Sequence, residues 1–171
     1  MTSAERARDL AKPPVYVVGA ASAGDHSMIS QMPDLTTTAG AISGPAAFAM
    51  AGVTPDDVDL LMGYDSFTIT VIIQLEDLGF CKRGEGGRFV ADGNLISGVG
   101  RLPFNTDGGG LCNNHPGNKG GMTKILEAVR QCRGEAHPAV QVKDHHTVLA
   151  HATGGMLTAH HASSTVIRQA E

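Results

Sequence analysis

A glycine-rich stretch with one histidine is the part of the sequence best suited to chemistry. Residues 105–121 hold runs of three and of two consecutive glycines, with His115 between the runs. Glycines let the backbone turn with positive φ and approach a ligand closely. A helical pattern of apolar residues begins at Met122, so amides of the loop would point to a ligand at a helix start. A thioester or phosphate site fits this pattern, and so does a tight turn with a histidine packed beneath it.

Two further segments carry side chains that could move protons. Tyr64 and Asp65 end an apolar run that predicts a strand, and α/β sheets place ligand groups at strand ends. A tyrosine hydroxyl can donate to an oxyanion or act as an acid or base. Alternatively, the hydroxyl is only hydrogen-bonded at the edge of the sheet and has a structural role. Asp65 is expected to cap a helix or to orient a neighbour. His151 directly follows another predicted strand, where it could exchange protons near neutral pH or pack beneath a turn.

Alternating strand and helix patterns are expected to position these segments. Strands are predicted at 15–19, 58–64, 139–142, 147–150 and 162–167, and helices at 4–11, 39–51, 67–78 and from 122 onward. Residues 1–14 are expected to form an N-terminal helix and linker, 20–35 a long loop, and 88–97 a small hairpin. A strand, a polar turn and a helix in series are typical of a parallel or mixed sheet. The sequence thus predicts an α/β fold, with residues 1–171 in a single domain.

Three motifs, in this order along the chain, resemble those of the thiolase superfamily. Tyr-Asp-Ser-Phe at 64–67 stands where thiolases carry Asn-Glu-Ala-Phe or His-Asp-Cys-Phe. The spacing of Asn105, Gly108, Gly109, His115 and Pro116 resembles the thiolase pattern Asn-x-x-Gly-Gly followed by Gly-His-Pro. His-Ala-Thr-Gly-Gly at 151–155 stands at the place of the last motif, Cys-x-Gly-Gly-Gly. The chain is most similar to the C-terminal half of sterol-carrier or lipid-transfer-protein thiolases and of the related side-chain aldolases.

The resemblance implies both a fold and a set of roles. The fold would be a C-terminal thiolase-type domain, with a mixed β-sheet packed between layers of helices. His115 would hold the thioester oxygen in an oxyanion hole, while Tyr64 and His151 would handle protons. The substrate would be a coenzyme A thioester, with no permanently bound cofactor. The implied substrate-binding residues are Asn105, Gly108, Gly109, Asn114, Gly154 and Gly155.

One departure from the family pattern affects the expected reaction. The family usually has Asn or His where this chain has Tyr64, and that side chain fixes a catalytic water. The tyrosine therefore favours an aldolase-like variant over ordinary Claisen chemistry. Cys81 and Cys112 lack the context that activates a nucleophile, and the acyl-accepting cysteine of the family lies in the N-terminal half.

The expected function follows from that missing half. The chain is expected to be part of an acyl-CoA-processing enzyme, of the acetyltransferase or retro-aldolase type, whose site is completed by another chain or by a missing N-terminal half. The implied partner is a complementary N-terminal half or a homologous subunit, and an OB-fold acyl-CoA-associated protein is a further candidate. The alternative is a non-catalytic scaffold subunit of a lipid or acyl-CoA complex.

Composition narrows the other possibilities. A net charge of −4 and a pI near 6.0 give no electrostatic case for nucleic acid or an anionic membrane. The apolar runs are far shorter than a membrane span. The adjacent histidines at 145–146 and 160–161 lack metal-ligand spacing, so no metal site is expected. Three cysteines argue against a disulfide framework, and a charged N-terminus argues against a signal peptide, so a cytoplasmic location is expected.

Overall fold

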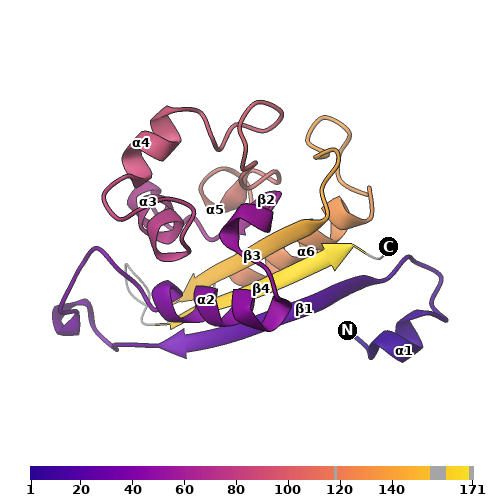
Figure 1. Cartoon of the computed structure of the whole chain (residues 1–171), viewed down its shortest axis with the longest axis horizontal. Helices are drawn as coiled ribbons and strands as arrows, with labels where there is room; N and C mark the ends of the chain where they lie inside the picture. The colour runs from indigo at the N-terminus through magenta and orange to yellow at the C-terminus, as the bar shows by residue number, and fades with distance from the viewer. Residues whose placement is uncertain (118, 155–160, 170–171) are drawn as a thin grey trace.

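A computed structural model of the chain describes residues 1–117, 119–154 and 161–169 (Figure 1). Its central feature is a mixed sheet in the order β1-β4-β3-β2. β1 (Val15–Gly24) pairs antiparallel with β4 (His161–Gln169), which pairs antiparallel with β3 (Thr147–Gly154), which pairs parallel with β2 (Leu60–Gly63). On its other side, β2 forms a parallel bridge between Leu61 and Phe104. The predicted mixed sheet is confirmed.

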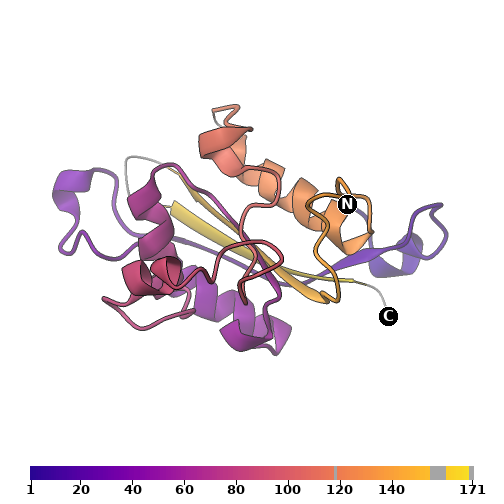
Figure 2. The same cartoon turned by 90° about the horizontal axis from the view of Figure 1, so that it is seen from above.

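Helices cover both faces of this sheet (Figure 2). α2 (Gly40–Ala51), α3 (Thr68–Asp77) and α4 (Gly86–Ala91) lie on one side, and α6 (Gly120–Cys132) lies on the other. The shorter elements are α1 (Ala4–Ala7), α5 (Gly109–Cys112) and 3-10 turns at Ile29–Gln31 and Pro55–Asp57. Within the described residues, no helix is both long and apolar enough to cross a membrane.

The side chains of β3 alternate between two buried apolar clusters. Leu149 packs in the cluster that contains Ala47 of α2, whereas Val148 and Ala150 pack in the cluster that contains Ala128 of α6. Successive side chains of a strand point to opposite faces, so both faces of β3 are buried. A strand buried on both faces has a continuous apolar sequence, and this is why it could be recognised as a strand.

Most of the predicted elements are confirmed, but the first strand is longer than expected. The helices predicted at 39–51 and 67–78 and the strands at 147–150 and 162–167 are all present. β1 continues to Gly24, so the loop predicted at 20–35 begins after that residue. The residues from Ala20 to Gly24 are small or polar and have little strand propensity. Pairing with β4 over this whole stretch overrides that weak propensity.

Two other predicted elements are wrong. The segment 88–97 does not form a hairpin, because helix α4 includes its first residues and buries Phe89 in the core. The segment 139–142 is not a strand. The side chain of Gln131 instead satisfies its backbone by donating to the carbonyl of Val140 and accepting from the N–H of Val142.

Candidate active site

The strand-end tyrosine and the loop histidine meet at the C-terminal ends of the parallel strands. Tyr64 directly follows β2, and its backbone N–H donates to the carbonyl of His151 on β3 at 2.9 Å. Its hydroxyl oxygen lies 2.9 Å from Nε2 of His115, and the two ring centroids are 5.8 Å apart. Two of the three residues predicted to be catalytic therefore form a hydrogen-bonded pair, at the edge where α/β sheets hold their ligands.

Asp65 anchors the loop that carries the histidine. Its buried carboxylate accepts hydrogen bonds from the backbone N–H groups of Gly110 at 2.7 Å and Leu111 at 3.2 Å. Gly109 has a φ of 66°, and a Cβ added there would collide with Oδ2 of Asp65. Only glycine combines that backbone conformation with such a close approach. Asp65 thus orients the turn by binding the N–H groups of α5.

The start of α6 supports the tyrosine ring from the other side. A Cβ added at Gly120 would collide with the ring of Tyr64, and one at Gly121 would lie 2.7 Å from Cβ of Ala152. Burial, and to a smaller extent the charge of Asp65, raise the pKa of Tyr64 above its ordinary value. The phenol is therefore protonated at neutral pH, and it can exchange a proton with the imidazole beside it.

His151 points away from this pair. Its side chain is fully buried, its Nδ1 lies 2.9 Å from Oγ of Ser164, and a Cβ at Gly40 of α2 would lie 3.3 Å from its Nε2. These contacts are on the face that α2 covers, whereas Tyr64 lies against α6. Alternation along β3 places Ala152, not His151, on the face of the tyrosine. Burial also lowers the pKa of His151 to about 4, so this imidazole is neutral at neutral pH.

The residues predicted to bind substrate lie mostly in the histidine loop. Asn105 is buried with a φ of 46°, and both polar atoms of its side chain are without a hydrogen-bond partner. An unpaired buried amide is costly unless water or a ligand completes it. Gly108 and Gly109 form the turn into α5, Asn114 precedes the histidine, and Gly154 ends β3. Gly155 lies outside the described residues.

Sequence reasoning missed Asp107, which organises the histidine loop. Its carboxylate accepts hydrogen bonds from the backbone of Gly109 at 3.0 Å and from Nδ2 of Asn114 at 2.6 Å. An aspartate two residues before a glycine in a turn is a recognisable signal for the first of these bonds. Lys124, which lies 3.5 Å from Oδ1 of Asp107, was also missed, because a lysine in an amphipathic helix is normally exposed.

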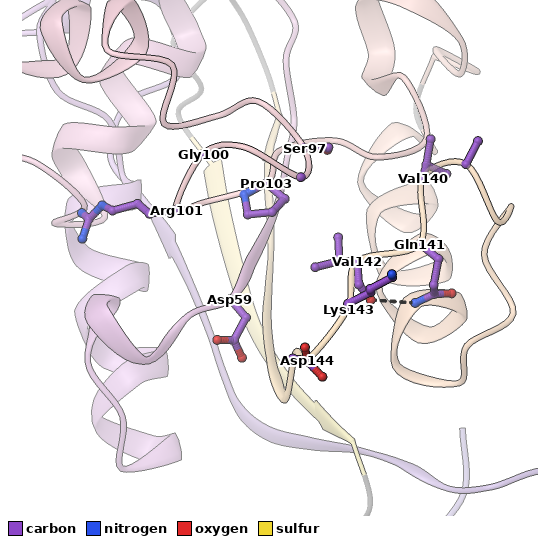
Figure 3. Close-up of a pocket in the computed structure, with 12 residues that line it drawn as sticks. Asp59, Ser97, Gly100, Arg101, Pro103, Val140, Gln141, Val142, Lys143 and Asp144 are labelled. Atoms are coloured by element: carbon purple, nitrogen blue, oxygen red, sulfur yellow. Dashed lines mark hydrogen bonds between the residues drawn. The ribbon is translucent and has the colours of Figure 1, made fainter.

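A separate cleft lies away from these side chains and does not contain this chemistry (Figure 3). It has a volume of about 580 Å³ and lies between the loops 97–103 and 139–144. Asp59 and Asp144 line it just before β2 and β3, so it lies at the N-terminal ends of the parallel strands. The carboxylate of Asp59 accepts hydrogen bonds from the backbone N–H groups of His146 and Thr147, which makes it structural.

Metal ligands do not gather in the described parts of the chain. Residues 1–117, 119–154 and 161–169 include no group of three or more His, Cys, Asp or Glu side chains that could hold a metal ion. His160 lies outside these residues.

Comparisons with known proteins agree with this architecture. The model of the thiolase C-terminal domain-like family matches residues 21–167. The chain is 42% identical over 144 residues to a steroid side-chain-cleaving aldolase of Thermomonospora curvata, with 78% of this chain and 34% of that protein covered. It is 42% identical over 160 residues to 17-hydroxy-3-oxo-4-pregnene-20-carboxyl-CoA lyase of Mycobacterium tuberculosis, with 88% and 39% covered.

A solved structure extends the likeness to the fold. The Ltp2-ChsH2(DUF35) aldolase superimposes with a TM-score of 0.84 at 38% identity, over 97% of this chain and 42% of that chain. The chain therefore spans well under half the length of the relatives that it matches.

Proposed function

Because the chain belongs to the thiolase C-terminal domain-like family, we propose that it supplies the C-terminal part of the active site of an acyl-CoA-processing enzyme. The enzyme would make or break a carbon–carbon bond next to a coenzyme A thioester. The contact of 2.9 Å between the Tyr64 hydroxyl and Nε2 of His115 carries this proposal. Relatives named as an aldolase and a CoA lyase favour cleavage of the aldol type.

The chemistry of the pair suits such a cleavage. The hydroxyl of a β-hydroxyacyl thioester passes its proton to the oxygen of Tyr64, while Tyr64 passes its own proton to Nε2 of His115. The Cα–Cβ bond then breaks, a ketone is released, and the electron pair moves into the thioester enolate. The imidazolium charge stabilises the enolate oxygen, and the proton finally returns to Cα. Because the pKa of Tyr64 is raised, a free tyrosinate is unfavourable, so this relay needs the histidine.

The surface around the pair is that of an incomplete site. His115 is exposed, and the two helices beside the pair carry half-exposed apolar side chains, Leu111 on α5 and Met122 and Leu126 on α6. Proteins that act as monomers seldom leave such a cluster open beside a catalytic group. We propose that the rest of the enzyme covers this face and contributes the remaining catalytic groups.

The exposed part of the sheet supports a place for that covering part. Helix α6 packs on β2, β3 and the Ile167 end of β4. Farther along the same face, β1 and β4 carry the exposed small residues Ala20, Ser22 and Ser163. Directly paired strand residues share a face, and Ser163 pairs with Ala152 beside the start of α6. Small residues let a helix approach a sheet closely. The proposed partner is thus a complementary half of the fold, with a helix beside α6.

Turnover of the complete enzyme tests the proposal. The chain is assembled with its complementary half, and release of ketone from a β-hydroxyacyl-CoA is measured. His115→Ala is expected to lower kcat by roughly 10²-fold or more, because it removes both the proton acceptor and the stabilising charge. His146→Ala changes an exposed histidine at the other end of β3 and serves as the control. Unchanged turnover of His115→Ala would leave the chain as a non-catalytic scaffold.

A further inference from the structure

A buried lysine lies beneath the loop that carries His115. The side chain of Lys124 on α6 is 0% exposed, and its Nζ lies 3.5 Å from Oδ1 of Asp107, which is 8% exposed. Removing an ammonium from water is costly, and a buried ion pair seldom gives a net gain in stability over apolar side chains. This pair therefore needs an explanation other than stability.

Asp107 holds the loop together as far as the residue before the histidine. Its Oδ1 accepts from the backbone N–H of Gly109 at 3.0 Å, and its Oδ2 accepts from Nδ2 of Asn114 at 2.6 Å. Its own carbonyl accepts from Nδ2 of Asn113 at 2.7 Å. The orientation of this one carboxylate thus determines the course of the backbone that leads to His115.

A second connection joins the same loop to the same turn of α6. The hydroxyl of Thr123 donates to Oδ1 of Asn114 at 3.0 Å, and Thr123 directly precedes Lys124 in the sequence. The helix that provides both connections begins at Gly120, against the ring of Tyr64. One rigid element therefore supports the tyrosine directly and the histidine through Asp107 and Asn114.

We propose that the Lys124–Asp107 ion pair is a positioning device, which fixes the histidine loop on α6 so that Nε2 of His115 stays at the hydroxyl of Tyr64. Neither residue touches the substrate in this account, and the inference rests on the proposed function. The charge of Lys124 is essential, because a neutral side chain would fill the space without orienting the carboxylate of Asp107. A misplacement of about 1 Å in a catalytic group can lower a rate by roughly 10²-fold.

The test uses Lys124→Met and Asp107→Asn in the complete enzyme with its complementary half. Both variants are expected to lower kcat by roughly 10- to 100-fold with KM nearly unchanged, since the contacts with bound substrate remain. Glu127→Gln is the matched control. Glu127 is also buried on α6, but it accepts from Thr106 at 3.1 Å and has no hydrogen bond to Asp107, so kcat should stay at the wild-type value.

A double variant separates positioning from stability. Lys124→Met combined with Asp107→Asn removes both buried charges, so the thermal midpoint should recover relative to either single variant. We expect kcat to remain low, because the carboxylate that orients the loop is still missing. Recovery of kcat together with stability would overturn the inference, as would wild-type kcat in the folded single variants. If either single variant fails to fold, the double variant decides alone.

His115→Ala, measured in parallel, separates this inference from the proposed function. If it leaves turnover unchanged, the proposed function fails. If it lowers turnover while the Lys124 and Asp107 variants retain wild-type kcat, only the positioning role fails.

Discussion

Tyr64 makes two contacts in the candidate site. Its hydroxyl contacts His115, and its ring packs against the start of α6. Tyr64→Phe keeps the ring and removes the hydroxyl. We expect it to lower kcat of the complete enzyme by about 10²-fold, with little change in thermal stability. Tyr16→Phe, which changes the other of the two tyrosines, is the control. A kcat close to that of the wild type for Tyr64→Phe would remove the tyrosine from the proton relay.

The burial of His151 predicts that the stability of the chain depends on pH. Its pKa in the folded chain is about 4, lowered by burial from 6.5. The unfolded chain therefore binds a proton between these values that the folded chain does not, so stability falls as pH decreases from 6.5 to 4. From pH 7 to pH 5 we expect a loss of roughly 2 kcal/mol from this group, at about 1.4 kcal/mol per unit.

Urea unfolding of the chain at pH 7 and pH 5 measures that slope. His151→Gln should flatten the dependence on pH, because no buried imidazole is left to be protonated on unfolding. His146→Gln changes an exposed histidine and should keep the wild-type slope. Equal slopes in the wild type and His151→Gln would show that the buried imidazole does not determine acid stability.

At the scale of elements, the start of α6 and the end of β2 depend on a glycine where they meet. Gly120→Ala would push a Cβ into the ring of Tyr64, so we expect a loss of roughly 1–3 kcal/mol in stability together with a lower kcat. Gly87→Ala in α4 is the matched control, because nothing lies within 4 Å of a Cβ there. That control should stabilise the chain by up to about 1 kcal/mol. Stabilisation by both substitutions would show that the tyrosine ring has room to move.

The sequence predicts the elements that have strong apolar patterns. It does not predict the elements that form only by pairing with a segment distant in sequence. The two-sided strand β3 and helix α3 have such patterns, whereas residues 20–24 become a strand only through pairing with β4. The candidate site residues also divide into those whose positions could be predicted and those whose positions could not. The contact between His115 and Tyr64 could be predicted because their motifs resemble those of a known family. The orientation of His151 could not, because the period of a strand does not tell which phase faces which helix.

Within the described residues, the outer side of α2 is exposed and apolar, and it lies away from the candidate site. Met50, at 66% exposure, and Ile42 lie on the outer side of α2, and the start of that helix covers His151 on the opposite face of the sheet from Tyr64. Ser163 and Ser22 lie on the face of α6, beside the ends of the strands that hold the pair. We therefore expect a part of the enzyme that completes the site to approach on the face of α6.

Ser163→Arg tests that geometry directly. Ser163 is exposed, so the substitution should leave the stability of the chain nearly unchanged. In the assembled enzyme, however, it would bury an unpaired charge against the incoming helix, which costs several kcal/mol and weakens assembly by on the order of 10²-fold or more. Ile42→Arg, on the outer side of α2, should assemble with wild-type affinity. Titration of each variant with the complementary half gives the two affinities. If Ile42→Arg were the variant that failed to assemble, the partner would bind on α2, and the pair of Tyr64 and His115 would remain open to solvent in the assembled enzyme.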